Sequence, residues 1–178
     1  MDLEERLATL SKASDEEDLG PITQGAQASD STIRGIEDVL CRRLPGDYIR
    51  FLKRYGAIGI GDINFFGTWS DSVDDLRGAT VLGETLRLRK EFSLPQDLVA
   101  VFGSDYESYL CLNCSAIEGL PKMVYFSATQ KSVFACEHSN SFEEFVMKYI
   151  DALLGKRWVP KAQLKQASLL QRIMTKFK

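Results

Sequence analysis

The chain has 178 residues, of which 44% are hydrophobic and 26% are charged, and its formal net charge is −3. These values are typical of one soluble globular domain and exclude a disordered polar chain. No stretch is long and apolar enough to span a bilayer, and the acidic first residues do not resemble a secretory leader. We therefore expect a cytoplasmic protein, in which the four cysteines form no disulfide framework.

The two ends of the chain differ in charge. Residues 1–30 carry eight acidic and two basic side chains, whereas residues 151–178 carry seven basic side chains and one acidic one. Such asymmetry is typical of interacting tails, although the two ends could also pair with each other. The sequence predicts an acidic N-terminal helix and linker over 1–31, a central domain over 32–154, and a basic amphipathic tail helix over 155–178.

Two short helices are predicted between Ile33 and Gly56. Apolar residues at three- and four-residue spacing indicate the first helix, and Pro45 suits the first turn of the second. Asp47 lies in that first turn, where the helix dipole favours a carboxylate, and Gly56 ends the helix. The apolar stripes are Ile33, Ile36, Val39 and Leu40 in the first helix, and Tyr48, Phe51, Leu52 and Tyr55 in the second.

The rest of the central domain alternates short apolar runs with turn residues. We expect strand structure over 60–69 interrupted at Gly67, a helix over 73–91, and further strands over 98–102, 108–112, 123–126 and 132–136. Ser141 is the expected N-cap of a last helix, with Glu144 completing a capping box. The buried stripe of that helix is Phe142, Phe145, Val146, Tyr149, Ile150 and Leu153. This order of elements predicts an α+β fold with a mainly antiparallel sheet flanked by helices.

Three segments resemble the SUKH superfamily, which joins fungal cell-wall-assembly regulators to bacterial toxin-immunity proteins. In the first segment, Ile36-Glu37 precedes residues 44–56, which contain the pattern Leu-Pro-x-Asp-Tyr-x-x-Phe-Leu-x-x-Tyr-x-Gly. Residues 102–105 are similar to a glycine- and acid-rich turn between the family's strands, and residues 141–145 are similar to its closing helix. The resemblance covers residues 33–154 and implies a SUKH-like fold.

The resemblance also implies a non-catalytic protein-binding module. In the immunity branch the partner is a toxin domain, often a nuclease, which is neutralised by occlusion. An acidic inhibitor that faces a basic nuclease gains association rate from electrostatic steering. The candidate partner-binding residues are acids and aromatics outside the predicted core stripes, namely Asp62, Trp69, Asp71, Asp105, Tyr106 and Glu107. For the two aromatic residues, partial burial against the sheet is an equal alternative.

One cysteine pattern raises the question of a metal. Cys111 and Cys114 form a CxxC and Cys136 and His138 form a CxH, a ligand set that zinc accepts. Cys111 lies inside an apolar strand pattern, however, and a free cysteine ordinarily behaves as a small buried hydrophobe, which is also the interpretation for Cys41 and Cys136. We therefore expect no metal and no cofactor. The single histidine has no nucleophile motif beside it, so no catalytic residue is assigned.

Three other functions stay open. The same fold could serve a scaffold or regulator of cell-wall assembly. A small hydrolase with a carboxylate site would need a deep pocket that holds titratable groups with perturbed pKa values. A membrane-peripheral regulator would dock through the basic, amphipathic residues 161–178, whose alternative is packing on the domain. Direct nucleic-acid binding is not expected because the central domain is slightly acidic.

Overall fold

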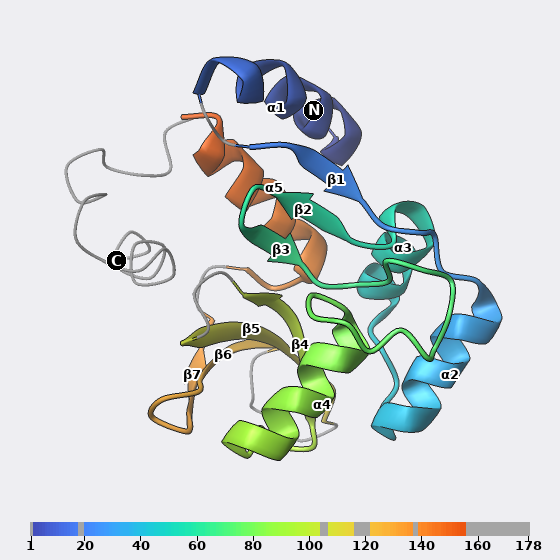
Figure 1. The fold of residues 1–178 in the computed structure, drawn as a ribbon. Helices are drawn as coiled ribbons and strands as arrows, with labels where there is room; N and C mark the ends of the chain where they lie inside the picture. The colour runs from blue at the N-terminus through green and yellow to red at the C-terminus, as the bar shows by residue number, and fades with distance from the viewer. Residues whose placement is uncertain (1, 18–19, 104–106, 116–121, 137–138, 156–178) are drawn as a thin grey trace.

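The computed structural model describes residues 2–17, 20–103, 107–115, 122–136 and 139–155 (Figure 1). Within these residues, five helices surround one antiparallel sheet of seven strands, which confirms the predicted α+β fold. The helices are α1 (Leu3–Glu17), α2 (Asp30–Leu40), α3 (Gly46–Tyr55), α4 (Val81–Phe92) and α5 (Phe142–Leu153). The strands are β1 (Ile22–Gln24), β2 (Ile58–Ile60), β3 (Ile63–Phe65), β4 (Leu98–Gly103), β5 (Ser108–Asn113), β6 (Met123–Ser127) and β7 (Ser132–Ala135).

The strands follow one another across the sheet in chain order, from β1 at one edge to β7 at the other. The central strand β4 is buried along its whole length and carries a bulge between Ala100 and Phe102. A bulge leaves backbone groups outside the ladder, and buried groups of this kind need other partners. The Ala100 amide donates to Thr85 Oγ1 of α4 at 3.0 Å, and the Val101 carbonyl accepts the Phe66 amide at 2.8 Å. The bulge therefore fastens the middle of the sheet to α4 and to the end of β3.

Helix α5 covers one face of the sheet and α4 covers the other (Figure 1). Phe145 and Tyr149 of α5 meet Phe65 and Phe102 of the sheet, and the ring centroids of Phe102 and Tyr149 are 5.0 Å apart. Such tilted and edge-on aromatic contacts add to the stabilisation that burial alone provides. These rings form the centre of the core between α5 and the sheet.

The Leu-Pro-x-Asp-Tyr segment links α3 to two distant parts of the chain. Tyr48 is fully buried, and its hydroxyl donates to the Phe66 carbonyl at 2.7 Å. Asp47 Oδ2 accepts the backbone amide of Phe142 at 2.9 Å, at the N-terminus of α5. Gly56 has φ +65°, and a Cβ there would collide with the carbonyl of Ala26. We infer that these residues fix the packing of α3 rather than contact a partner directly.

The N-terminal segment contributes an edge strand to the sheet, which differs from the helix and linker predicted over residues 1–31. Helix α1 continues to Glu17, and β1 pairs with β2 through Ile22 and Ile60. Only Ile22 of β1 is not exposed, and a strand this short shows no readable alternation in the sequence. The N-terminal helix is present as predicted, and its Leu3, Leu7 and Leu10 side chains are all buried. Arg6 joins α1 to α5 by donating to Asp151 at 2.9 Å.

Several local predictions need correction. The helix predicted over 73–91 begins only at Val81, where Thr80 Oγ1 accepts the Gly83 amide, and residues 66–80 form a loop. The strand predicted over 60–69 is a hairpin that turns at Gly61 rather than at Gly67. Val39, predicted to be on the buried stripe, is exposed.

Two helix ends also differ in detail from the prediction. Ser141 Oγ accepts the Glu144 amide as expected, but Glu144 Oε2 accepts the amide of Asn140 instead of the N-cap residue. Cys41 is exposed rather than buried, because it ends α2 in the left-handed conformation with φ 54°. The predicted tail helix over 155–178 lies, from residue 156 onward, outside the described residues.

Candidate functional site

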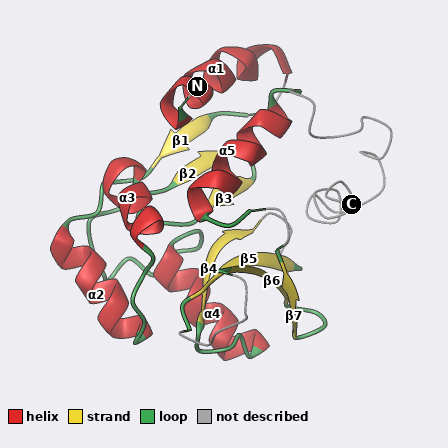
Figure 2. Ribbon diagram, turned by 180° about the vertical axis from the view of Figure 1, so that it is seen from behind, coloured by secondary structure: helices red, strands yellow, loops and turns green. Residues whose placement is uncertain are grey.

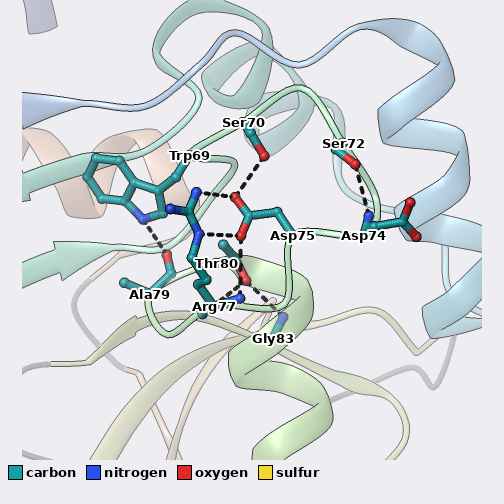
Figure 3. Close-up of polar contacts among 9 residues, drawn as sticks. All are labelled: Trp69, Ser70, Ser72, Asp74, Asp75, Arg77, Ala79, Thr80 and Gly83. Atoms are coloured by element: carbon teal, nitrogen blue, oxygen red, sulfur yellow. Dashed lines mark hydrogen bonds and ion pairs between the residues drawn. The ribbon is translucent and has the colours of Figure 1, made fainter.

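The loop between β3 and α4, residues 66–80, is the most distinctive surface feature of the described chain. Its two ends meet where the Val81 amide donates to the Gly67 carbonyl at 2.9 Å, and the Thr68 amide donates to the Gly56 carbonyl at 3.1 Å. Compact surface loops whose ends lie close together frequently carry function on a rigid scaffold. We refer to residues 66–80 as the β3–α4 loop (Figure 3).

Trp69 lies across the inside of the β3–α4 loop. Its indole Nε1 donates to the Ala79 carbonyl at 3.1 Å, and the tip of the ring lies over Gly59 of β2. Gly59 alternates with Ile58, whose partner Phe65 packs on α5, so the indole lies on the face of the sheet opposite α5. Trp69 is half-buried there. Both interpretations of this residue are therefore compatible with its position: it packs on the sheet and keeps part of its surface exposed.

A bidentate ion pair closes the far side of the β3–α4 loop. Asp75 accepts from Arg77 Nε at 2.7 Å and from Arg77 Nη2 at 2.8 Å, and Ser70 Oγ donates to the same carboxylate at 2.8 Å (Figure 3). The Asp75 side chain is only 7% exposed, whereas that of Arg77 is 71% exposed. The hydrogen bonds from Arg77 hold the pKa of Asp75 well below its ordinary value, so the pair is ionised at neutral pH. This pair determines the shape of the loop.

A third contact fastens the β3–α4 loop to α2. Asp71 Oδ1 accepts the backbone amide of Ser29 at 2.9 Å, and Ser29 is the N-cap of α2. The hydrogen bond from the Ser29 backbone, together with one from Thr32, lowers the pKa of Asp71. Anionic groups are stabilised at helix N-termini by the helix dipole. Asp71 therefore holds the loop in place while its residue stays exposed.

The outer side of the β3–α4 loop combines acidic and apolar groups. Asp71 and Asp74 are exposed. Leu76, which directly precedes Arg77, is 56% exposed. The loop contains three acids and one base, so its formal charge is −2. The cavity beneath the loop has a volume of about 10 Å³, which is room for one water molecule at most. The cavity beneath the loop is therefore too small to hold a small-molecule ligand.

A family model described as SMI1-KNR4 cell-wall (SUKH_5) matches residues 4–151, which is most of the chain. This chain belongs to the SUKH family. A comparison with curated proteins found no match. The family match begins within α1, so it includes the N-terminal segment that the sequence separates from the central domain.

The SUKH signature residues support the β3–α4 loop from below. Tyr48 binds the carbonyl of Phe66, the first residue of the loop, and the Gly56 carbonyl binds the amide of Thr68. Tyr48 and Gly56, which belong to the segment that resembles the family, are therefore buried supports of the loop. We infer that the family pattern specifies the scaffold of the loop, whereas exposed residues that do not anchor it, such as Asp74 and Leu76, are free to suit a particular partner.

The structure divides the six predicted contact residues of this SUKH protein between two ends of the sheet. Trp69 and Asp71 lie in the β3–α4 loop. Asp62 and Glu107 are exposed turn residues at the opposite end of β3, because Asn64 of β3 faces Gly103 of β4. Asp105 and Tyr106 lie outside the described residues. No finding tests their role in binding, so these contacts stay predictions.

Sequence analysis missed Asp74, Leu76 and Arg77 because it assigned them to a helix. The relevant signal was the run from Ser70 to Gly78. It holds two serines, three aspartates and a glycine, and its two apolar residues are too few to form a helical stripe. Thr80 followed by Glu84 also indicates a helix start near residue 81, since threonine is a favoured N-cap.

The cysteines show no arrangement typical of a metal centre in the described residues. Within that part of the chain, no group of three or more His, Cys, Asp and Glu side chains could hold a metal ion. Cys111 is buried in β5, and burial raises the pKa of its thiol; burial also raises the pKa of Cys114 to about 11. His138 lies outside the described residues. The described helices include none long and apolar enough to cross a membrane.

Proposed function

We propose that this SUKH protein is a non-catalytic binding module that neutralises a toxin domain by covering it, and that the β3–α4 loop contacts the toxin. Membership of the SUKH family supports a protein-binding role. The superfamily that the chain resembles includes toxin-immunity proteins, which act by binding a protein. The surface of the loop supports the choice of site. The partner is a protein with a basic face, such as a nuclease.

The observation that carries the proposal is a loop that is fixed by hydrogen bonds and yet exposes an apolar side chain and carboxylates. Trp69, Asp71 and Asp75 hold the loop through hydrogen bonds to Ala79, Ser29 and Arg77. Binding costs free energy when loops and side chains become ordered, and a loop that is already ordered avoids most of that cost. Protein interfaces usually have an apolar centre and a polar rim, and Leu76 with the acids beside it matches that arrangement.

The charge of the β3–α4 loop determines which partner it favours. Because Arg77 neutralises Asp75, the carboxylates of Asp71 and Asp74 give the outer surface its negative charge. Opposite charge on the partner accelerates association, and salt screens this effect over roughly 10 Å at 0.1 M ionic strength. An acidic loop therefore suits the cationic surface with which nucleases hold phosphate backbones.

The second candidate function is a scaffold or regulator of cell-wall assembly. The description of the matching family as SMI1-KNR4 cell-wall favours it. The two functions use the same kind of contact and differ in what the partner does. A partner that is toxic when expressed alone identifies the first function, and a partner without toxicity that acts in wall synthesis identifies the second.

An affinity capture from the native cell lysate tests the proposal. We expect the wild-type chain to retain a stoichiometric partner at low salt and to lose much of it at high salt. The variant Asp74→Lys with Leu76→Ala should retain much less partner, because it reverses a charge and removes the exposed apolar side chain. Neither side chain anchors the loop, so the melting temperature should stay unchanged.

The variant Asp62→Lys makes the same charge reversal at the opposite end of β3 and distinguishes the two groups of predicted contacts. If the β3–α4 loop is the contact site, this variant should retain the partner as the wild type does. Retention that is lost with Asp62→Lys but kept with the loop variant would place the contact at the turns around Asp62 and Glu107. Retention that neither variant affects would contradict an acidic recognition surface altogether.

A further inference from the structure

The last strand of the sheet, β7, is an open edge on which apolar side chains are exposed. It lies at the outer end of the sheet in both views, with no described helix beyond it (Figure 1, Figure 2). Val133 is 44% exposed and Phe134 is 40% exposed, and Ala135 beside them is exposed as well. Their neighbours on β6, Phe126 and Tyr125, are both buried. The covering of the sheet therefore ends at its last strand.

The exposed side chains lie on both faces of β7, because successive residues of a strand point to opposite sides. Phe134 continues the row of Leu110 and Phe102 across the sheet, and Phe102 packs on α5. Val133 continues the row of Tyr109 on the other face, where α4 donates a hydrogen bond to the Tyr109 hydroxyl. A strand added beside β7 would therefore meet an apolar side chain on each face.

The outward backbone groups of β7 belong to Val133 and Ala135. At the end of the β6–β7 ladder, the Cys136 amide donates to the Met123 carbonyl at 3.2 Å. Hydrogen-bonded and non-hydrogen-bonded pairs alternate along an antiparallel ladder, so the next residue that bonds to β6 is Phe134. The amides and carbonyls of Val133 and Ala135 therefore point away from β6, which is the arrangement that an added strand requires.

The other edge of the sheet has protection that β7 lacks. Strand β1 has only three residues, its Thr23 and Gln24 are polar, and Pro21, which has no amide to donate, directly precedes it. Strand β7 contains no charged residue and no proline. An apolar edge without such protection is a template for pairing with another chain.

Charge identifies the kind of segment that fits this edge. Residues 122–136 form β6, β7 and the turn between them, and they contain two lysines and no acid. With Glu137, the next residue, the stretch still holds two bases against one acid, in a chain whose net charge is −3. Both lysines are exposed, and within the described residues neither forms an ion pair. Opposite charge on a partner therefore favours binding here.

The two lysines lie at the two ends of the edge. Lys131 directly precedes β7, and Lys122 directly precedes β6, whose first residues pair with the end of β7. At a rise of about 3.4 Å per residue, the six positions between these ends span roughly 20 Å. An extended segment of about seven residues covers this length and can place one acid near each lysine.

Two occupants from this chain fit less well. Residues 156–178 carry seven bases and no acid, so they would add positive charge beside the lysines. A second copy that paired through β7 alone would share a strand of four residues, whereas stable interfaces contain about 20–30 residues on each side. An acidic segment of another protein is the occupant that both charge and size favour.

We propose that β7 binds an extended acidic segment of a partner protein as an additional strand of the sheet. The backbone of the segment bonds to Val133 and Ala135, its apolar side chains cover Val133 and Phe134, and its acids pair with Lys122 and Lys131. Strand addition of this kind takes affinity from main-chain hydrogen bonds and specificity from alternate side chains. Strand β7 shares no residue with the β3–α4 loop, and the inference does not depend on the function proposed for that loop.

An NMR titration of the ¹⁵N-labelled full-length chain tests this inference. The probe is a capped peptide of seven residues, with glutamate at both ends and alternating threonine and valine between them. We expect saturable shifts confined to β6, β7 and the turn between them. With the peptide at about ten times its Kd, exchange of the Val133 and Ala135 amides with solvent should slow about tenfold. The Phe134 amide is already bonded to β6 and should change much less.

Two variants separate the contribution of charge from that of the backbone. Lys122→Glu with Lys131→Glu should weaken peptide binding at least about fivefold, because it reverses both charges. Val133→Pro should abolish binding, because it removes an amide that points away from β6 and leaves the hydrogen bonds of the β6–β7 ladder in place. The control Lys90→Glu changes an exposed lysine of α4 and should bind as the wild type does. Unchanged shifts of β5 show that each variant is folded.

Control peptides and the oligomeric state make the test decisive. A peptide with lysines in place of the glutamates should bind more weakly, and a peptide with proline in place of its central threonine should not bind. Equal binding of either peptide would overturn the inference, and so would the absence of saturable binding of the glutamate peptide. Sedimentation of the free chain should show a monomer. A dimer that Val133→Pro dissociates would assign the edge to a second copy instead.

Discussion

At the scale of single residues, Tyr48 makes the contact on which the β3–α4 loop depends most. We expect Tyr48→Phe to lower the free energy of unfolding by about 1–3 kcal/mol, because the buried carbonyl of Phe66 would lose its hydrogen bond. Urea unfolding followed by circular dichroism measures the change. Tyr55→Phe is the matched control, because it removes the hydroxyl of another tyrosine of α3. This variant should change stability by less than about 0.5 kcal/mol. Equal losses in both variants would contradict the assigned role of Tyr48.

The ion pair of Asp75 and Arg77 predicts a dependence of stability on pH. Arg77 lowers the pKa of Asp75 in the folded chain, so the pair stabilises the protein above the unfolded carboxyl pKa of about 3.9. That contribution disappears as the pH falls below this value toward the folded pKa. Wild type should therefore melt higher than Asp75→Asn at pH 7, and the difference should shrink steadily between about pH 4 and pH 2. A difference independent of pH would show that Asp75 acts through packing alone.

At the scale of elements, α4 ends in a conformation that its residue does not favour. Ser93 has φ 62°, in the left-handed region where glycine costs least. We expect Ser93→Gly to raise the free energy of unfolding by about 0.5–1 kcal/mol, and Ser93→Val to lower it, since a β-branched side chain suits this region poorly. Thermal melting of both variants measures the effect. A loss of stability in Ser93→Gly would mean that the Ser93 side chain itself stabilises the end of α4.

The elements that the sequence predicted well are those whose apolar residues form a helical stripe or a continuous run. Helices α2, α3 and α5 bury side chains at three- and four-residue spacing, and strands β4, β5 and β6 are continuous apolar runs buried along most or all of their length. The short edge strand β1 and the β3–α4 loop could not be predicted in this way. Residues such as Asp71 and Asp75 are placed by hydrogen bonds to Ser29 and Arg77, and no periodicity encodes those contacts.

The candidate surface could be predicted only in part for the same reason. Trp69 and Asp71 were recognisable as polar and aromatic residues outside any apolar stripe. Leu76 was not, because an apolar residue between charges fits the pattern of an amphipathic helix equally well. Which exposed residues lie together depends on the sheet register, and the pairing of Asn64 with Gly103 places Asp62 and Glu107 at the same end of β3, opposite the start of the β3–α4 loop.

At the scale of the whole molecule, α1 and β1 belong to the folded core rather than to a tail. Leu10 is fully buried, so Leu10→Ala should lower the free energy of unfolding by about 2–5 kcal/mol. Leu76→Ala, at an exposed position, should leave it within about 0.5 kcal/mol of the wild-type value. Chemical unfolding monitored by fluorescence compares the two variants. A small effect of Leu10→Ala would show that α1 is a detachable arm.

The β3–α4 loop and helix α3 are both fastened to the start of α2. Asp71 of the loop accepts the Ser29 amide at 2.9 Å, and Lys53 of α3 pairs with Asp30 at 2.6 Å. Helix α5 contacts both α1 and α3 (Figure 2). Lys53 and Asp71 contact neighbouring residues at the start of α2, so substitutions of the two need not act additively.

Rescue of cell growth tests the central claim most directly. The partner captured from the lysate is expressed with either the wild-type chain, the variant Asp74→Lys with Leu76→Ala, or the variant Asp62→Lys. We predict that the partner alone stops growth, that the wild type and Asp62→Lys restore growth, and that the loop variant does not. Restored growth with the loop variant at equal expression, or a partner that is harmless alone, would contradict neutralisation through the β3–α4 loop.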